Sequence, residues 1–365
     1  MEPLNLDEYA KVAAEKLPPM VFDYFEGGSD DELTIRENRL AWQRIMLRPR
    51  VLIDVSQRDL STSILGQPVD FPILTAPCGV NAMAHPDGEL AVARATTAMK
   101  TLQIVSTVAT YSLEDIADAA PSGLRWFQLY CFRDRGLTRA LVDRAVAAGY
   151  SALCLTVDTP ILGRRERDFR NQFQFPLGIR WNNLVPYMNA KMGSDDEATA
   201  LRNFVDNNWD ASTTWETVDW LRQLSPLPLV LKGILSPDDA RLAVAHGAQG
   251  IVVSNHGGRQ LDGAIPTAAA LGEIVAAIGE MAEIYVDGGI RRGSDVLKAL
   301  ALGARAVLIG RPYLWGLAID GQAGVRRVLE LLKAELDLCM ALSGLRTIQE
   351  IHRNLVICPD RSGKA

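Results

Sequence analysis

Eight short apolar runs alternate with amphipathic stretches between residues 72 and 310, and this alternation constrains the fold more than any other feature of the sequence. Such a pattern indicates βα units and a parallel sheet. Eight units in a chain of 365 residues predict an α/β fold with a closed TIM (β/α)8 barrel rather than an open sheet. The predicted strands are residues 72–76, 103–107, 125–130, 152–158, 229–233, 250–254, 283–287 and 306–310.

The segment before the barrel has a helical pattern over about its first 65 residues. Asn5 predicts a helix start, Gly27-Gly28 predicts a helix end, and Ser29-Asp30 predicts the start of the next helix. No Gly-x-Gly-x-x-Gly motif follows a predicted strand, so a Rossmann-type dinucleotide site has no support. We therefore expect a single domain over residues 1–365, with an N-terminal helical segment (1–65) and a barrel (66–365).

One connection is much longer than the others, because an insertion at about residues 160–228 separates the fourth and fifth predicted strands. It contains a polar stretch at residues 193–197. It also contains the aromatic residues Trp181, Tyr187, Phe204, Trp209 and Trp215. A long insertion beside an active face is often a lid, and a surface segment without function is the alternative.

Charge and composition exclude several classes of partner. The 38 basic and 44 acidic residues give a net charge of −6, which argues against nucleic acids and anionic membranes. No apolar run reaches the ~20 residues of a membrane-spanning helix, and neither a signal peptide nor a peroxisomal address is evident, so we expect a cytoplasmic protein. The five scattered cysteines argue against a disulfide framework and against a metal site.

Polar side chains mark the carboxyl ends of the predicted strands from the second to the eighth. In a TIM barrel these ends meet at one rim, where catalytic residues lie, and phosphate binds near the seventh and eighth strands. A barrel without such a site would show only one or two polar residues at these places. The residues are Ser106, Gln128, Tyr130, Thr156, Asp158, Lys232, Ser254, His256, Asp287 and Arg311.

The run at residues 254–262, Ser-Asn-His-Gly-Gly-Arg-Gln-Leu-Asp, follows the sixth predicted strand directly. It presents His256 and Arg259 three positions apart across two glycines, which let the backbone approach a ligand closely. Histidine is the usual base near neutral pH, and arginine binds a carboxylate through two hydrogen bonds. A histidine taken alone is as readily a surface or core residue, so the context of the run carries this hypothesis.

Motifs along almost the whole chain resemble the FMN-dependent α-hydroxy-acid oxidase and dehydrogenase family, in its order and spacing. Within that family the chain looks most similar to the glycolate and lactate oxidase branch. The motifs lie at residues 24, 76–77, 84–86, 128–130, 158–160, 163–166, 231–233, 254–262, 287–289 and 310–311.

The resemblance implies roles for the catalytic and substrate-binding residues. His256 would be the base, and Asp158 would orient its ring and stabilise its cation. Arg165 and Arg259 would hold the substrate carboxylate, while Tyr24 and Tyr130 would donate hydroxyl groups to the substrate. Without the resemblance, Arg165 could be a surface charge and Tyr24 a core aromatic.

The resemblance also implies FMN as the cofactor and no metal. Gly288, Gly289 and Gly310, with Arg291 and Arg311, would bind its phosphate. Asp287 would bind ribityl hydroxyls, and Lys232 would face the N1–C2 edge of the flavin; an ion pair at the barrel mouth is the alternative for Lys232. The remaining positions that match flavin contacts are Pro77, Cys78, Gly79, Ser106, Gln128, Thr156 and Ser254.

Two positions depart from the family pattern. Glycolate-oxidising members carry Trp at the position of Val108, so we expect a wider pocket that prefers L-lactate or a larger (S)-2-hydroxy acid. Cys78 stands where relatives often have Thr. With O2 as acceptor, the products would be the 2-oxo acid and H2O2. The alternatives are a dehydrogenase that uses a quinone or cytochrome, a flavin-dependent isomerase, and a non-catalytic FMN-binding barrel. A homo-oligomer, tetramer or octamer, is expected from the resemblance.

Overall fold

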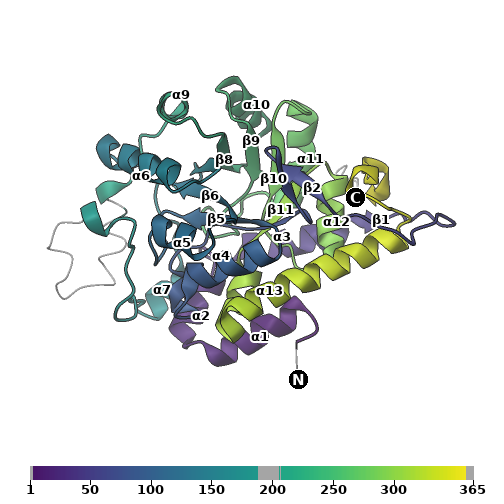
Figure 1. Cartoon of the computed structure of the whole chain (residues 1–365), viewed down its shortest axis with the longest axis horizontal. Helices are drawn as coiled ribbons and strands as arrows, with labels where there is room; N and C mark the ends of the chain where they lie inside the picture. Colours follow the sequence, from purple (N-terminus) through teal and green to yellow (C-terminus); the bar gives the residue numbers. More distant parts are fainter. Residues whose placement is uncertain (1–2, 188–204, 206, 359–365) are drawn as a thin grey trace.

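A closed barrel of eight parallel strands forms the centre of the computed structural model, which describes residues 3–187, 205 and 207–358 (Figure 1). Strands follow one another around the barrel in chain order, and the last pairs with the first. The predicted TIM barrel and all eight of its strands are therefore confirmed. The strands are β4 (Ile73–Thr75), β5 (Leu102–Ser106), β6 (Leu124–Leu129), β7 (Ala152–Thr156), β8 (Leu229–Ile234), β9 (Gly250–Val253), β10 (Glu283–Val286) and β11 (Ala306–Ile309).

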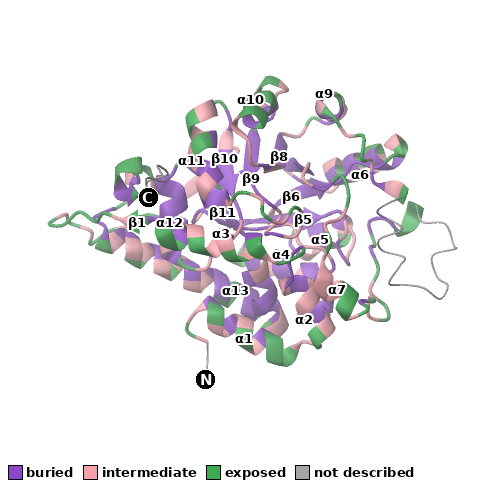
Figure 2. Ribbon diagram, turned by 180° about the vertical axis from the view of Figure 1, so that it is seen from behind, coloured by how far each residue is buried: buried purple, intermediate pink, exposed green. Residues whose placement is uncertain are grey.

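The strands are buried on both faces, which is why they are apolar throughout rather than alternating (Figure 2). In β7, Ala152 and Cys154 belong to one apolar cluster, while Leu153 and Leu155 belong to a second cluster shared with the surrounding helices. A hairpin of β2 (Thr62–Ile64) and β3 (Gln67–Val69) adds its apolar side chains to the first cluster. The hairpin thus covers one end of the barrel, and the opposite end remains for a site.

Helices surround the barrel, and their ends carry the capping residues expected from the sequence (Figure 1). Asp134 accepts hydrogen bonds from two backbone N–H groups of the first turn of α6, and Gly149 follows that helix with φ of +74°. Asp320 and Gly321 interrupt the longest helix, α13. The helices are α4 (Gly88–Ala98), α5 (Leu113–Ala119), α6 (Arg135–Ala147), α9 (Trp215–Leu224), α10 (Pro237–Ala245), α11 (Thr267–Ile278), α12 (Gly293–Ala301) and α13 (Arg311–Leu342).

The N-terminal segment contains α1 (Leu6–Lys16), α2 (Pro19–Glu26) and α3 (Leu33–Arg44). The predicted start at Asn5 is confirmed, but the prediction that Ser29-Asp30 begins the next helix is wrong. The backbone N–H groups of Ser29 and Asp30 donate to the carbonyls of Gly258 and Arg164, so these residues form tertiary contacts instead.

The helical prediction also fails beyond residue 44. Two short strands, β1 (Met46–Leu47) and β12 (Val356–Ile357), pair antiparallel, and β2 and β3 follow before the barrel begins. The partner of β1 lies some 300 residues away in the chain, so local sequence gave no signal for the pairing.

Helix α3 forms hydrogen bonds with the loops that follow β9 and β10. The side-chain amides of Asn38 and Asn255 exchange two hydrogen bonds of 2.8 Å, and both residues are buried. The indole of Trp42 donates to the Gly288 carbonyl at 2.8 Å, and Asp262 accepts from the backbone of Thr34 at 2.8 Å. These buried polar bonds fix the N-terminal segment to the rim of the barrel.

The insertion predicted at 160–228 leaves β7, includes the short helix α7 (Glu166–Arg170), and returns to the barrel through α9. Its polar stretch at 193–197 and Phe204 lie outside the described residues. Within the described part of the chain, no helix is long and apolar enough to cross a membrane. Among the same residues, no cluster of three or more histidine, cysteine or acidic side chains is arranged to hold a metal.

Two glycines of the rim test how tightly the N-terminal helices pack. We expect Gly258→Ala to lower the melting temperature far more than Gly263→Ala. Both glycines have positive φ, but a Cβ at Gly258 would lie 2.8 Å from the Ile35 backbone nitrogen, whereas a Cβ at Gly263 would meet nothing within 4 Å. Backbone strain of roughly 1 kcal/mol is common to both, and only Gly258→Ala adds overpacking of about 1–3 kcal/mol. Equal melting temperatures for the two variants would contradict this packing.

Candidate active site

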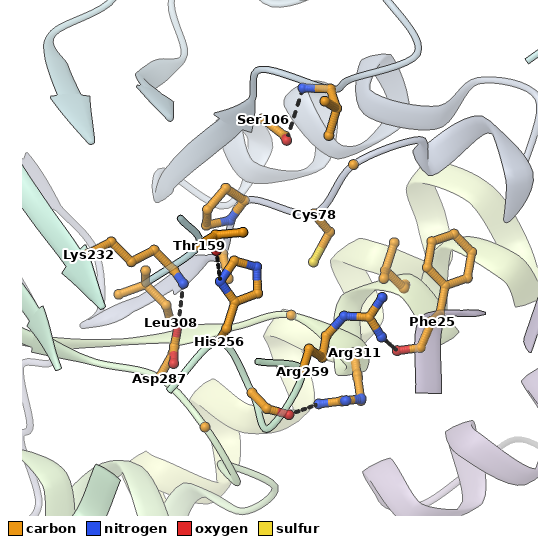
Figure 3. A pocket seen from close by; sticks show the side chains of 18 of the residues that line it. Phe25, Cys78, Ser106, Thr159, Lys232, His256, Arg259, Asp287, Leu308 and Arg311 are labelled. Atoms are coloured by element: carbon orange, nitrogen blue, oxygen red, sulfur yellow. Dashed lines mark hydrogen bonds and ion pairs between the residues drawn. The ribbon is translucent and has the colours of Figure 1, made fainter. Parts of the chain in front are cut away.

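A cavity of about 160 Å³ opens at the carboxyl ends of the barrel strands, opposite the β2–β3 hairpin (Figure 3). Seventeen of the residues predicted for the site line it. They are Tyr24, Pro77, Cys78, Gly79, Ser106, Val108, Tyr130, Arg165, Lys232, His256, Arg259, Asp287, Gly288, Gly289, Arg291, Gly310 and Arg311.

Four predicted residues do not line this cavity. Three of them form hydrogen bonds to residues that do line it. Gln128 accepts from Ser106 at 3.2 Å, and Ser254 accepts from Lys232 at 3.0 Å. Asp158 bonds His256. The fourth, Thr156, lines a neighbouring cavity.

The imidazole of His256 is held by a carboxylate and a hydroxyl group. Its Nδ1 lies 2.8 Å from Asp158 Oδ1. It also lies 3.3 Å from Thr159 Oγ1 (Figure 3). Because Nδ1 is engaged by a carboxylate, the proton of the neutral ring belongs on Nδ1 and the lone pair on Nε2. The backbone of His256 has φ of +57°, which costs about 1–3 kcal/mol for a residue other than glycine. The loop therefore holds a strained conformation that presents this ring.

The protonation states of the pair suit a base. Burial lowers the pKa of His256, and the charge of Lys232 acts in the same direction, against the opposing effect of Asp158. Burial by itself would raise the pKa of Asp158, but its interactions with His256 and the charge of Lys232 keep that pKa below its usual value. At neutral pH the site thus contains a neutral imidazole beside an ionised carboxylate, which can stabilise the imidazolium once it forms.

Guanidinium groups at the rim donate mainly to backbone carbonyls, and the Glu26 carboxylate lies 3.9 Å from Arg311 Nε. Arg259 donates to the Gly27 carbonyl at 2.7 Å, and Arg311 donates to the carbonyls of Gly27 and Gly257 at 3.1 and 2.9 Å. Burial and the neighbouring cations lower the pKa of Arg259 to about 9. Burial lowers the pKa of Arg291 to about 10. Cations that carboxylates neutralise only in part are a prepared environment for anionic ligands.

Lys232 differs from the arginines because carboxylates surround it. Its Nζ lies 3.3 Å from Asp287 Oδ2, and its side chain is only 4% exposed. Burial opposes its charge, but the carboxylates of Asp287 and Asp158 raise the pKa of Lys232 above its ordinary value. A permanent, buried positive charge therefore faces the cavity.

Sequence reasoning missed part of the lining. Thr159, which bonds both members of the His256–Asp158 pair, was not proposed although it follows Asp158 directly. The insertion supplies four more of the missed residues, and its aromatic content was the available signal. They are Leu162, Trp181, Val205 and Trp209. Further missed residues, such as Phe25, Leu308 and Leu314, come from the helices and strand ends around the rim.

A closed barrel that combines a neutral imidazole, an ionised partner and guanidinium groups has the groups an enzyme needs to deprotonate an anionic substrate beside a second anionic ligand. Comparison with known proteins gives the family: the chain belongs to the FMN-dependent dehydrogenases, whose family model matches residues 13–358.

Several relatives are similar over nearly their whole length. The chain is 54% identical to an L-lactate oxidase from Nostoc sp. (strain PCC 7120), over 96% of each chain. It is 47% identical to a glycolate oxidase from Spinacia oleracea, over 97% of this chain and 95% of the relative. Among solved structures, a mandelate oxidase with (S)-4-hydroxymandelic acid matches with a TM-score of 0.92 at 43% identity, over 97% of this chain and 98% of that chain.

Family membership confirms the predicted family and its cofactor, FMN, and assigns the FMN-dependent oxidation of an (S)-2-hydroxy acid. The described residues fit FMN. Buried polar atoms of Gln128 (Nε2), Asp287 (Oδ1) and Arg291 (Nε) have no hydrogen-bond partner within the described part of the protein. Leaving such groups unpaired is costly. FMN carries carbonyl acceptors, ribityl hydroxyls and a phosphate that can satisfy them.

The titration of the base gives a pH test. We expect kcat/KM to fall as the pH drops through the pKa of His256, below the ordinary value of about 6.5. Asp158→Asn removes a carboxylate that raises this pKa, so the acid limb should move to lower pH. The variant should also lose ~10²–10⁴-fold in kcat, because the imidazolium loses its partner. Asp219→Asn is the control, since Asp219 bonds His246 away from the cavity at 2.9 Å. A limb that moves to higher pH would contradict the assignment.

Proposed function

We propose that the protein is an (S)-2-hydroxy-acid oxidase whose preferred substrate is L-lactate, with O2 reduced to H2O2. The largely enclosed, hydrogen-bonded His256–Asp158 pair beside Arg259 is the observation that carries this proposal. A neutral base next to a carboxylate-binding cation matches a substrate with adjacent hydroxyl and carboxylate groups. The 54% identity to an L-lactate oxidase supports the choice of acid and acceptor.

Arg165 and Arg259 bind the substrate carboxylate in this proposal. Two backbone carbonyls of α2 and the loop after it hold Arg259, which also lies 5.4 Å from the Tyr24 ring centroid. Tyr24 stacks on Phe173 with ring centroids 4.5 Å apart. Arg259 is therefore held in place before the substrate arrives, which limits the ordering cost of binding.

With the carboxylate fixed, His256 Nε2 takes the hydroxyl proton, and Asp158 stabilises the resulting imidazolium across the 2.8 Å bond. Tyr130 donates its hydroxyl group to the substrate; burial raises its pKa, so it stays protonated. The chemistry that FMN supplies, when bound, is two-electron acceptance from the α carbon and reoxidation by O2.

The residues proposed to hold FMN form three groups. Arg291 and Arg311, with the glycines at 288, 289 and 310, bind the phosphate, and Asp287 binds the ribityl chain. Lys232 places its fixed positive charge at the flavin edge. The flavin ring contacts are Ser106, Gln128, Thr156 and Ser254, with the backbone of Pro77, Cys78 and Gly79. Burial raises the pKa of the Cys78 thiol, so Cys78 acts by packing rather than as a thiolate.

The function is tested by mixing the FMN-loaded protein with L-lactate without oxygen, following the visible flavin band, and then admitting air. Bleaching followed by rapid recovery with H2O2 supports the oxidase. Bleaching with slow recovery indicates the dehydrogenase alternative, which passes electrons to a quinone or cytochrome. No bleaching with lactate, glycolate or mandelate would overturn hydroxy-acid oxidation and leave a non-redox FMN barrel.

The size of the pocket gives a substrate prediction. We expect kcat/KM for L-lactate to exceed that for glycolate by ~10-fold or more, because Val108 leaves apolar space for the extra methyl group. Val108→Trp fills that space and should lower the lactate-to-glycolate ratio, as steady-state kinetics with both acids would show. A higher kcat/KM for glycolate than for L-lactate in the unmodified enzyme would contradict L-lactate as the preferred substrate.

The base is tested by matched histidine variants. We expect His256→Gln to keep FMN but lose roughly 10²–10⁴-fold in turnover, since glutamine cannot take the hydroxyl proton. His246→Gln is the control: His246 follows α10, bonds Asp219 and stacks on Trp215 outside the cavity. Flavin absorbance reports cofactor content, and the rate of flavin reduction reports turnover. Near-normal reduction by His256→Gln would remove His256 from its role.

A further inference from the structure

Trp209 stacks on Tyr130 at the wall of the substrate cavity. Their ring centroids are 4.0 Å apart with an angle of 21° between the planes, and Trp209 is 6% exposed. The two rings line the substrate cavity and also a second cavity beside it. We call the stacked pair Tyr130–Trp209 the partition, because it separates these two cavities.

The second cavity has a volume of about 440 Å³, compared with about 160 Å³ for the substrate cavity. Its apolar lining includes Val157, Trp215 and Val218, from the end of β7 and from α9. Asp210 and Asp239 also line it, but Arg135 pairs with the Asp210 carboxylate at 2.8 Å, so among the described lining residues no unpaired cation favours a second acidic group there. An uncharged alkyl or aryl group suits this space.

Substrate orientation directs the side chain toward this partition. The cations and His256 take the carboxylate and hydroxyl ends of a 2-hydroxy acid, which leaves the apolar lining for the side chain. The barrel and its surrounding helices supply part of that lining, including Val108, Leu308 and Leu314. The insertion between β7 and α9 supplies the rest: Leu162, Trp181, Val205 and Trp209.

Backbone hydrogen bonds fix Trp209 beside the strand end that carries Tyr130. The backbone of Asp210 donates to the Cys131 carbonyl at 3.0 Å, and Arg133 donates to the Asn208 carbonyl at 2.8 Å. Phe132 and Trp209 form an antiparallel bridge between these bonds. The buried indole Nε1 has no partner in the described residues, so ring stacking and backbone pairing, not a side-chain hydrogen bond, position the indole.

We propose that Trp209 is a specificity-determining residue that closes the side-chain end of the substrate cavity and positions Tyr130. The inference deepens the proposed function and rests on it. With Trp209 present, the enzyme takes 2-hydroxy acids with short side chains. Without the indole the two cavities join, and 2-hydroxy acids with an uncharged aryl or long alkyl side chain are admitted.

The test compares FMN-loaded full-length Trp209→Ala, Trp209→Leu, Trp209→Phe and Trp215→Ala with the unmodified enzyme on L-lactate and (S)-mandelate. We expect Trp209→Ala and Trp209→Leu to raise the mandelate-to-lactate ratio of kcat/KM by roughly tenfold or more. Trp209→Phe keeps an aromatic ring in the partition, so its mandelate-to-lactate ratio should stay within about threefold of that of the unmodified enzyme. Trp215→Ala enlarges only the second cavity and should leave the ratio unchanged.

A ratio that stays constant in Trp209→Leu, or that rises equally in Trp215→Ala, overturns the proposal. Binding separates this failure from failure of the proposed function. Acetate and phenylacetate cannot be oxidised at a hydroxyl group, and their binding is followed through the flavin spectrum. If no hydroxy acid bleaches the flavin, the proposed function fails. The role of the partition is then still tested by ligand binding: Trp209→Ala should increase the affinity for phenylacetate relative to acetate by roughly tenfold.

Discussion

Closure of a parallel sheet is the constraint on which the remaining structure depends. It places the carboxyl ends of all eight strands on one rim, while the β2–β3 hairpin covers the other end. Residues as far apart in sequence as Ser106 and Arg311 thereby line one cavity. A single βα unit could supply at most one or two of these groups, so the chemistry requires the closed barrel.

The rim concentrates positive charge that the protein only partly neutralises. Lys232 has carboxylate neighbours and keeps its charge firmly, whereas Arg259 has carbonyl neighbours and its pKa is depressed. This difference divides the cations by role. Lys232, whose charge has a carboxylate partner, can polarise a ligand that lies beside it. Arg259, which lacks a carboxylate hydrogen-bond partner in the described part of the chain, is stabilised most by binding an anionic ligand. Binding of the substrate carboxylate and the FMN phosphate should therefore stabilise the folded protein.

The sequence predicted the barrel because strands buried on both faces are apolar without interruption. It predicted the strand-end residues because they follow those runs directly. The contacts of Ser29 and the pairing of β1 with β12 could not be predicted, since both depend on chain that returns from more than 200 residues away. The partition could not be predicted either, because nothing near Trp209 in the sequence indicates that its ring stacks on Tyr130.

In the proposed function, chemistry and substrate selection are assigned to different parts of the chain. The base, its partner and the cations at the strand ends are fixed by barrel register and by buried bonds such as Asn38–Asn255. Part of the apolar wall comes from the insertion, which pairs with the segment after β6 through an isolated bridge between Phe132 and Trp209. Neither His256 nor Asp158 belongs to the insertion, and the two residues bond each other directly. In the proposed function, a change at Trp209 can therefore alter which 2-hydroxy acid is accepted while the base and its partner keep their own contact.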